Sequence, residues 1–268
     1  MDHENYIYRQ KVFMVCAQEE DGTSYTFPGL DEFIEFIMLP ENEGALLIAH
    51  YSSGFDGQFL LREAIGGKHF VHGNTKPPVL KGQKIMTAQV QNHCRLIDSY
   101  NFVGAPLSSF TKIFDLNPEY SKGYFPHLFS CSKNMGVIGP IPAAEYYQPN
   151  QMSEAGRKKF LEWHHEQVEN KVKFDFRKDC ESYCQMDVTV LREGMLALRE
   201  KFLNLEDGNG RSLSMDIFNY VTIPSVCYAL FRTYFLQPDT IATVIPPREQ
   251  QYSAESIRWL EYEAEKRG

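Results

Sequence analysis

The sequence has no run of about 20 apolar residues, the length that an α-helix needs to cross a bilayer, so no transmembrane helix is expected. It begins with charged and polar residues, MDHENYIYRQ, which do not form a signal peptide. Basic charge is in deficit, because 27 Lys and Arg stand against 35 Asp and Glu. A generally basic, nucleic-acid-attracting surface is therefore excluded, and any contact with a polynucleotide must be local. These absences together lead us to expect an intracellular protein.

Paired cysteine motifs are also missing. No C-x-x-C pair occurs, and although Cys180 and Cys184 lie four residues apart in a helical stretch, the nearest histidines do not have the spacing of a zinc site. We expect reduced and mostly buried thiols, without disulfides or zinc. With 268 residues, 43% of them hydrophobic, the chain is long enough to bury a core without such cross-links. The six cysteines are Cys16, Cys94, Cys131, Cys180, Cys184 and Cys227.

The first 101 residues alternate between strand-like and helix-like patterns, which indicates an α/β fold. Short apolar or alternating runs predict strands over residues 11–18, 23–28 and 45–49, and two more within 77–101. Helical spacing of apolar residues predicts helices over 29–39 and 56–65.

After residue 101 the chain becomes mainly helical. A short helix is expected after Pro106, and three prolines and two glycines predict an ordered loop over 136–150. Helical segments are expected over 153–204, 223–236 and 253–268, with a break at 206–211. We therefore expect one domain over residues 1–204 and a helical C-terminal extension over 205–268.

Four acidic residues form candidate metal ligands, because Mg²⁺ prefers oxygen atoms. Asp2 and Glu4 form a D-x-E pair on one face of a strand. Asp56 follows an aromatic residue at a strand-to-helix junction, and Asp187 lies one helical turn after Tyr183. Each has a commoner structural explanation: Asp56 could cap a helix, and Tyr183 could be a core residue beside a solvated acid. Their occurrence in this order is harder to explain by chance.

In this order the motifs resemble the 3′-5′ exonuclease domain of family B DNA polymerases. The family's D-x-E motif is matched by Asp2-His3-Glu4, its N-x(2–3)-[FY]-D motif by YSSGFD, and its Y-x(3)-D motif by Tyr183 and Asp187. Longer stretches, among them LIDSYNFVGAPLSSFTKIF and KGYFPHLF, resemble the protein-primed branch. That branch occurs in adenovirus-like viruses, linear plasmids and Maverick/Polinton transposons. The resemblance covers about residues 2 to 267.

The resemblance implies an RNase H-like fold, in which helices flank a mixed sheet. It also implies metal-dependent 3′-5′ hydrolysis of DNA ends, the proofreading reaction of DNA replication. Two Mg²⁺ or Mn²⁺ ions would be the cofactors. Their ligands would be Asp2, Glu4, Asp56 and Asp187.

Further residues would position the DNA. By the same resemblance, Tyr183 would orient the attacking water and Lys122 would place a point charge near the scissile phosphate. The residues that would hold a single-stranded 3′ end are His50, Phe55, Ser99 and Tyr100. For Phe55, packing in the core is an equally good explanation. The expected partners are single-stranded DNA and, through the full-length polymerase, a terminal priming protein; no membrane partner is expected, and the chain should be a monomer.

Two departures from the family pattern keep a second function open. Tyr51 stands where the second motif of the family begins with Asn, and the D-x-E pair lies at the start of the chain. The palm motifs of the family, D-x-x-S-L-Y-P, K-x(3)-N-S-x-Y-G and D-T-D, do not occur, so we expect no polymerase active site here. The alternative is a catalytically inactive, transposon-derived fragment that keeps the fold and binds single-stranded DNA weakly. A structural module unrelated to nucleic acid would need the ordered motifs to be accidental.

Overall fold

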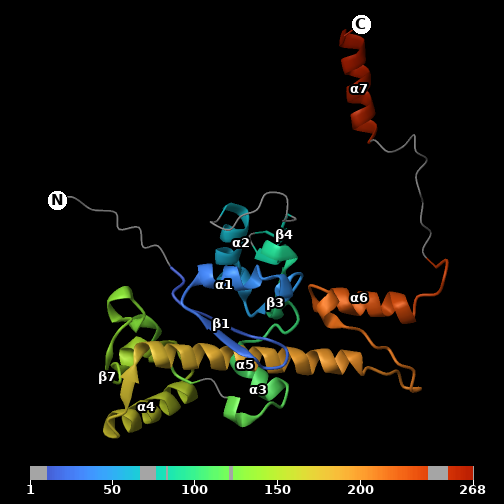
Figure 1. The fold of residues 1–268 in the computed structure, drawn as a ribbon. Coiled ribbons are helices and arrows are strands. Elements are labelled where there is room, and N and C mark those ends of the chain that lie inside the picture. Colours follow the sequence, from blue (N-terminus) through green and yellow to red (C-terminus); the bar gives the residue numbers. More distant parts are fainter. Residues whose placement is uncertain (1–10, 67–76, 83, 121–122, 241–252, 268) are drawn as a thin grey trace. The chain divides into compact units, whose positions relative to one another are not determined.

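The structure, a computed structural model, describes residues 11–66, 77–82, 84–120, 123–240 and 253–267. Its contacts divide the chain into two compact units, Met1–Cys227 and Tyr228–Gly268. The first unit is built on a mixed four-stranded sheet with helices packed against it (Figure 1). The predicted fold class, α/β with a mixed sheet flanked by helices and a helical C-terminal region, is confirmed. The domain boundary between residues 204 and 205 stays a prediction.

The central sheet has the strand order β3-β6-β5-β4. Strand β3 (Leu46–Ala49) is parallel to β6 (Arg95–Asp98), and the remaining neighbours, β5 (Lys84–Gln89) and β4 (Val79–Lys81), are antiparallel. Because successive side chains of a strand point to opposite faces, Leu96 and Ile97 enter different hydrophobic clusters. Strand β6 is thus buried on both faces, and its carboxyl end lies beside that of β3.

On one face of the sheet lie α1 (Leu30–Ile37) and α2 (Asp56–Gly66). Phe33 of α1 and Leu60 of α2 join Leu96 in one buried cluster. The apolar residues of α1 recur at helical spacing, so that burying them on the sheet leaves its acidic residues outside. Both helices were predicted, and their bounds agree with the prediction to within about two residues.

The opposite face carries α3 (Phe110–Ile113) and the long helix α5 (Phe176–Leu203). Phe110 is fully buried and shares a cluster with Val190 of α5. The two helices approach closely at Gly194, where a Cβ atom would lie only 2.5 Å from a ring carbon of Phe110. This close approach fixes the position of α5 against the sheet.

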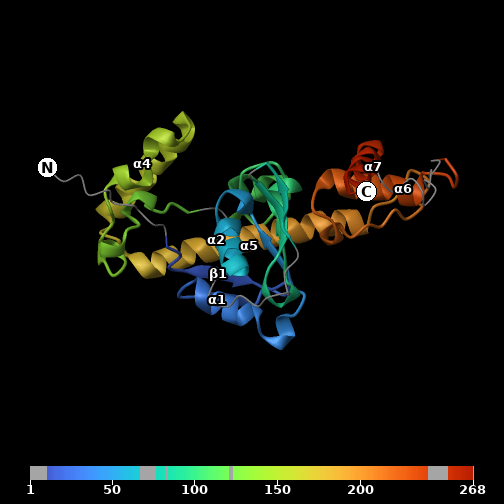
Figure 2. The same ribbon diagram turned by 90° about the horizontal axis from the view of Figure 1, so that it is seen from above.

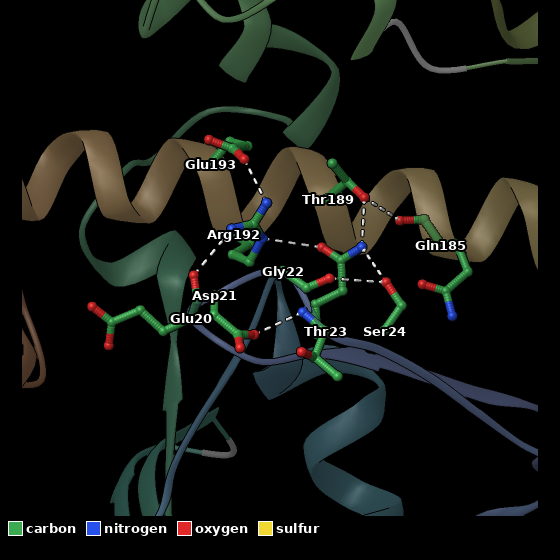
Figure 3. Close-up of polar contacts among 10 residues, drawn as sticks. Glu20, Asp21, Gly22, Thr23, Ser24, Gln185, Thr189, Arg192 and Glu193 are labelled. Carbon is green, nitrogen blue, oxygen red and sulfur yellow. Dashed lines mark hydrogen bonds and ion pairs between the residues drawn. The ribbon is translucent and has the colours of Figure 1, made fainter.

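The N-terminal hairpin forms a separate two-stranded sheet that packs on α5. It consists of β1 (Val15–Gln18) and β2 (Ser24–Phe27), so only the second half of the predicted strand 11–18 is regular. Figure 2 shows β1 between α1 and α5. The Arg192 side chain of α5 donates to the Glu20 carbonyl oxygen at 3.1 Å, and the Gln18 amide donates to the Thr189 hydroxyl at 2.8 Å. Figure 3 shows this polar network, which fastens the hairpin to the helix.

A third, small sheet corrects two predictions. Strand β7 (Ile138–Pro140) lies in the segment that was expected to be an irregular loop, and it pairs with β8 (Lys173–Asp175). Residues 153–204 were expected to be helical in two successive segments; these segments are α4 (Glu154–Glu169) and α5, and strand β8 lies between them. The pairing is antiparallel and joins distant segments, and it places the buried Phe174 in a cluster with Phe176. The stabilisation from this pairing and from the burial of Phe174 outweighs the tendency of proline and glycine to prevent regular structure.

The helices expected at the C-terminal end are confirmed as α6 (Ile223–Tyr234) and α7 (Ala254–Arg267). The expected break at 206–211 is a turn closed by a bridge between Glu206 and Ser212. In the part of the chain that the structure covers, no helix is long and apolar enough to cross a membrane.

All six cysteines are free, as expected. The expectation that most are buried is wrong, since only Cys94 is fully buried and Cys227 is exposed. Cys180 and Cys184 lie partly buried on α5, and desolvation raises the pKa of the Cys180 thiol to about 11.

Candidate active site

The junction between β3 and α2 carries the second motif. A turn with a short 3₁₀ helix at Ser52–Gly54 joins Ala49 to Asp56, the first residue of α2. A Cβ atom at Gly57 would lie 2.8 Å from the Ser52 carbonyl oxygen, so the turn requires glycine there. A carboxylate in the first turn of a helix is favoured by the helix dipole. The turn thus presents Asp56 at the carboxyl edge of the sheet.

Asp98, at the end of the neighbouring strand β6, holds this turn in place. Its side chain is buried, its Oδ2 atom accepts from the Ser53 backbone N–H at 3.0 Å, and its Oδ1 atom accepts from the Tyr100 N–H at 3.0 Å. Sequence reasoning did not select Asp98. The available signal was an acidic residue at the end of a buried apolar strand.

The electrostatic environment of Asp56 disfavours its negative charge. The residue keeps a solvent-exposed surface, yet nearby protein atoms partly desolvate the carboxyl group. This desolvation, and secondly the charge of Asp98, raise the pKa of Asp56 above its ordinary value. A divalent cation at Asp56 would offset both effects, and carboxylate oxygens are suitable Mg²⁺ ligands. The donor chemistry therefore fits the metal that the sequence motif implies.

Aromatic residues surround the same turn. Phe55 is 59% exposed, so it is not a core residue. The Tyr51 ring lies 5.4 Å from that of Tyr100 and 6.1 Å from that of Phe55, centroid to centroid. The structure thus brings together Asp56 and two of the predicted DNA-binding residues, Phe55 and Tyr100.

The other two predicted DNA-binding residues form a hydrogen-bonded pair. The Nδ1 atom of His50 lies 2.9 Å from the hydroxyl of Ser99, which is fully buried. The His50 ring also packs edge-on against Tyr100 and Phe110. Ser99 is therefore placed to orient His50.

The third motif lies on α5. Tyr183 packs against Phe125, and its hydroxyl lies 3.4 Å from Nε2 of His127. Asp187 is partly buried one turn later, around a small hollow that it shares with Thr111 and Tyr120. The predicted helical spacing of Tyr183 and Asp187 is therefore present in the structure.

Three predicted site residues, Asp2, Glu4 and Lys122, lie outside the described residues. Among the residues that are described, no group of three or more His, Cys, Asp or Glu side chains is placed to share a metal ion. Asp98 lies close enough to Asp56 for its charge to raise the pKa of Asp56.

Comparison with known proteins identifies the family. The model of the family described as DNA polymerase type B, organellar and viral, matches residues 37–258. The chain belongs to this family. The residues that match the type B polymerase family include Asp56, Asp98, Tyr183 and Asp187.

Three curated relatives of this type B polymerase chain carry the name "Probable DNA polymerase". The one from Ascobolus immersus is 26% identical over 76% of this chain, the one from Neurospora intermedia 23% over 78%, and the one from Agaricus bitorquis 24% over 70%. The matches cover 16%, 21% and 22% of these relatives, so the chain corresponds to a small part of each. No solved structure matches the chain.

Proposed function

We propose that this chain is the 3′-5′ exonuclease region of a protein-primed type B DNA polymerase, and that it hydrolyses single-stranded or mispaired DNA 3′ ends. The observation that carries the proposal is the arrangement at the β3–α2 junction. There Asp56, a carboxylate whose charge the protein disfavours, directly follows the exposed ring of Phe55. An RNase H-like arrangement of the mixed sheet is part of the same proposal.

Divalent metal would be held by four carboxylates: Asp2, Glu4, Asp56 and Asp187. These carboxylates would hold two Mg²⁺ or Mn²⁺ ions, whose charge would favour deprotonation of a bound water and departure of the 3′ oxygen. The raised pKa of Asp56 supports the assignment, because a nearby cation would favour the ionised form. Asp98 is better suited to positioning, since both its oxygens already accept backbone hydrogen bonds.

The remaining polar residues would bind and orient the substrate. Tyr183, whose hydroxyl lies near the His127 imidazole, would hold the attacking water. Lys122 would supply positive charge at the scissile phosphate. His50, oriented by Ser99, would contact the backbone of the DNA end, while Phe55 and Tyr100 would stack on its bases.

The test is release of mononucleotides from a 5′-labelled single-stranded oligonucleotide by the purified chain in Mg²⁺. We expect Asp56→Asn and Asp187→Asn to lower the rate by at least about 100-fold, as for the loss of one group that stabilises transition-state charge. Chelation with EDTA should abolish the activity. Glu162→Gln, on an exposed position of α4, is a matched control that should hydrolyse DNA normally.

Equal rates in the wild type and Asp56→Asn would contradict the proposal. A folded chain that releases no nucleotides in Mg²⁺ or Mn²⁺ would favour the catalytically inactive alternative.

A further inference from the structure

Exposed aromatic side chains gather at one place in the first unit. Among the described residues up to Cys227, the exposed aromatic residues are Tyr51, Phe55 and Tyr100, with exposed fractions of 43%, 59% and 39%. Their rings contact one another in sequence, Phe55 to Tyr51 to Tyr100. Exposed large apolar groups that cluster in this way mark a binding surface more often than isolated ones do.

The backbone at Tyr51 is in an unfavourable conformation. Its φ of 56° and ψ of 30° lie in the left-handed region, which bulky residues other than glycine rarely adopt. Such conformations persist where the surrounding structure enforces them, and they concentrate at functional sites. The conformation is not relieved by burying the ring, because the Tyr51 side chain remains exposed.

The neighbouring sequence leaves room for the Tyr51 ring. A Cβ atom at Gly54 would lie 2.8 Å from the Cε1 atom of Tyr51, so any larger residue at position 54 would displace the ring. Glycine at position 54 and the strained backbone at position 51 together keep this tyrosine on the surface between Phe55 and Tyr100. A tyrosine kept at the surface in this way is better explained by a ligand than by packing.

We propose that Tyr51 is a base-stacking residue, and that Tyr51, Phe55 and Tyr100 form a three-ring platform for the unpaired bases of a single-stranded DNA end. This inference rests on the proposed function and gives a role in it to Tyr51, which stands where the second motif of the family begins with Asn. Aromatic faces stack on bases of any sequence, as a proofreading site requires.

The groups around the platform suit a nucleotide better than an apolar peptide. Asp56, the proposed metal ligand, is the residue after Phe55, so bases on the platform would lie near the proposed cleavage site. The imidazole of His50, hydrogen-bonded to Ser99, packs against the Tyr100 ring in a T-shaped arrangement. Aromatic rings that can stack on bases therefore lie beside polar groups that can bind the sugar-phosphate backbone, and a single strand requires both.

The test is binding of a fluorescent single-stranded oligonucleotide to the full chain in EDTA, where metal-dependent hydrolysis is absent. Tyr51→Asn removes the ring, while asparagine tolerates the left-handed backbone. We expect its Kd to rise at least about five-fold, the lower end for loss of one stacking ring. Tyr51→Phe keeps the ring and should bind as the wild type does. Tyr228→Asn is the matched control at a 58% exposed tyrosine in α6, and its Kd should not change.

A stacking role also predicts coupling between Tyr51 and a base. Three oligonucleotides each carry a single abasic residue, at one of the last three positions of the 3′ end. The wild type should bind one of them more weakly than the intact oligonucleotide, by a factor similar to the rise in Kd that Tyr51→Asn causes. Tyr51→Asn should not distinguish that oligonucleotide from the intact one, because the ring and the base are two halves of one contact.

An unchanged Kd in Tyr51→Asn would overturn the inference. So would a loss of affinity that is the same in the wild type and in Tyr51→Asn for each abasic oligonucleotide. Such a result with normal nucleotide release in Mg²⁺ would refute the role of Tyr51 alone. Coupling in EDTA without any nucleotide release in Mg²⁺ would support the platform and refute the enzymatic proposal.

Discussion

The hydrogen bonds of Asp98 predict that Asp98→Ala destabilises the first unit substantially. The buried carboxylate accepts two backbone hydrogen bonds, from Ser53 and Tyr100, each at 3.0 Å. Hydrogen bonds to a charged group contribute about 1.5–3 kcal/mol each, which gives about 3–6 kcal/mol for the pair. Relief of the repulsion with Asp56, and access of water to the freed N–H groups, reduce the expected loss to about 2–4 kcal/mol. That is a large fraction of the stability of an ordinary domain.

Two measurements check this prediction in the full chain. Urea unfolding followed by far-UV circular dichroism gives the loss in free energy, with Asp98→Asn as the matched variant. The amide of that variant would keep one acceptor oxygen, so the expected loss is about 1–2 kcal/mol. Hydrogen exchange of the Ser53 and Tyr100 amides should accelerate more than exchange in the centre of α5. A loss in free energy of unfolding below about 0.5 kcal/mol for Asp98→Ala, or unchanged exchange at both amides, would refute the conclusion that Asp98 holds the turn in place.

Three further predictions follow from the packing and the charges. Arg199→Ala should lower the free energy of unfolding by about 1–3 kcal/mol at pH 7, because Arg199 donates to both carboxylate oxygens of Asp216. The control is Arg267→Ala, at a side chain that is 83% exposed. This control should change the free energy of unfolding by less than about 0.5 kcal/mol. Arg199 also lowers the pKa of Asp216, so this contribution is complete above the ordinary aspartate pKa and is lost as the pH falls through the lowered folded-state pKa; the difference between wild type and variant should shrink in urea unfolding below about pH 4. Gly194→Ala should cost about 1–3 kcal/mol in the same assay, since the new methyl group would meet an aromatic ring at 2.5 Å, and a neutral result would show that α5 can shift. Because the pKa of Asp56 is raised in the folded protein, wild-type stability falls as the pH rises above the ordinary aspartate pKa. Asp56→Asn should therefore be as stable as the wild type at pH 7, or more stable by about 0.2–1 kcal/mol. A clear loss of stability in this variant would mean that Asp56 has a structural role.

The local elements of the fold could be predicted from the sequence because their apolar residues are regularly spaced. The predicted strand 45–49 and helix 56–65 correspond to Leu46–Ala49 and Asp56–Gly66. The three-residue strands β7 and β8 could not be predicted, because neither has an internal pattern and their pairing joins residues 138–140 to 173–175. Contacts between distant segments decide such elements, and local composition then misleads.

The candidate site could be predicted only in part, for a similar reason. Asp56 was recognisable from its motif, but the role of Asp98 depends on β6 lying parallel to β3, which no local pattern reveals. Tyr51 was visible as a departure from the family motif, whereas its left-handed backbone and its contact with Tyr100 are properties of the folded turn.

The most direct test of the central claim is metal-dependent release of nucleotides from a DNA 3′ end. The purified chain is incubated with a 5′-labelled single-stranded oligonucleotide in Mg²⁺, beside Asp56→Asn. We expect stepwise shortening from the 3′ end by the wild type, and none in EDTA or by the variant. Shortening by Asp56→Asn at the wild-type rate would contradict the account.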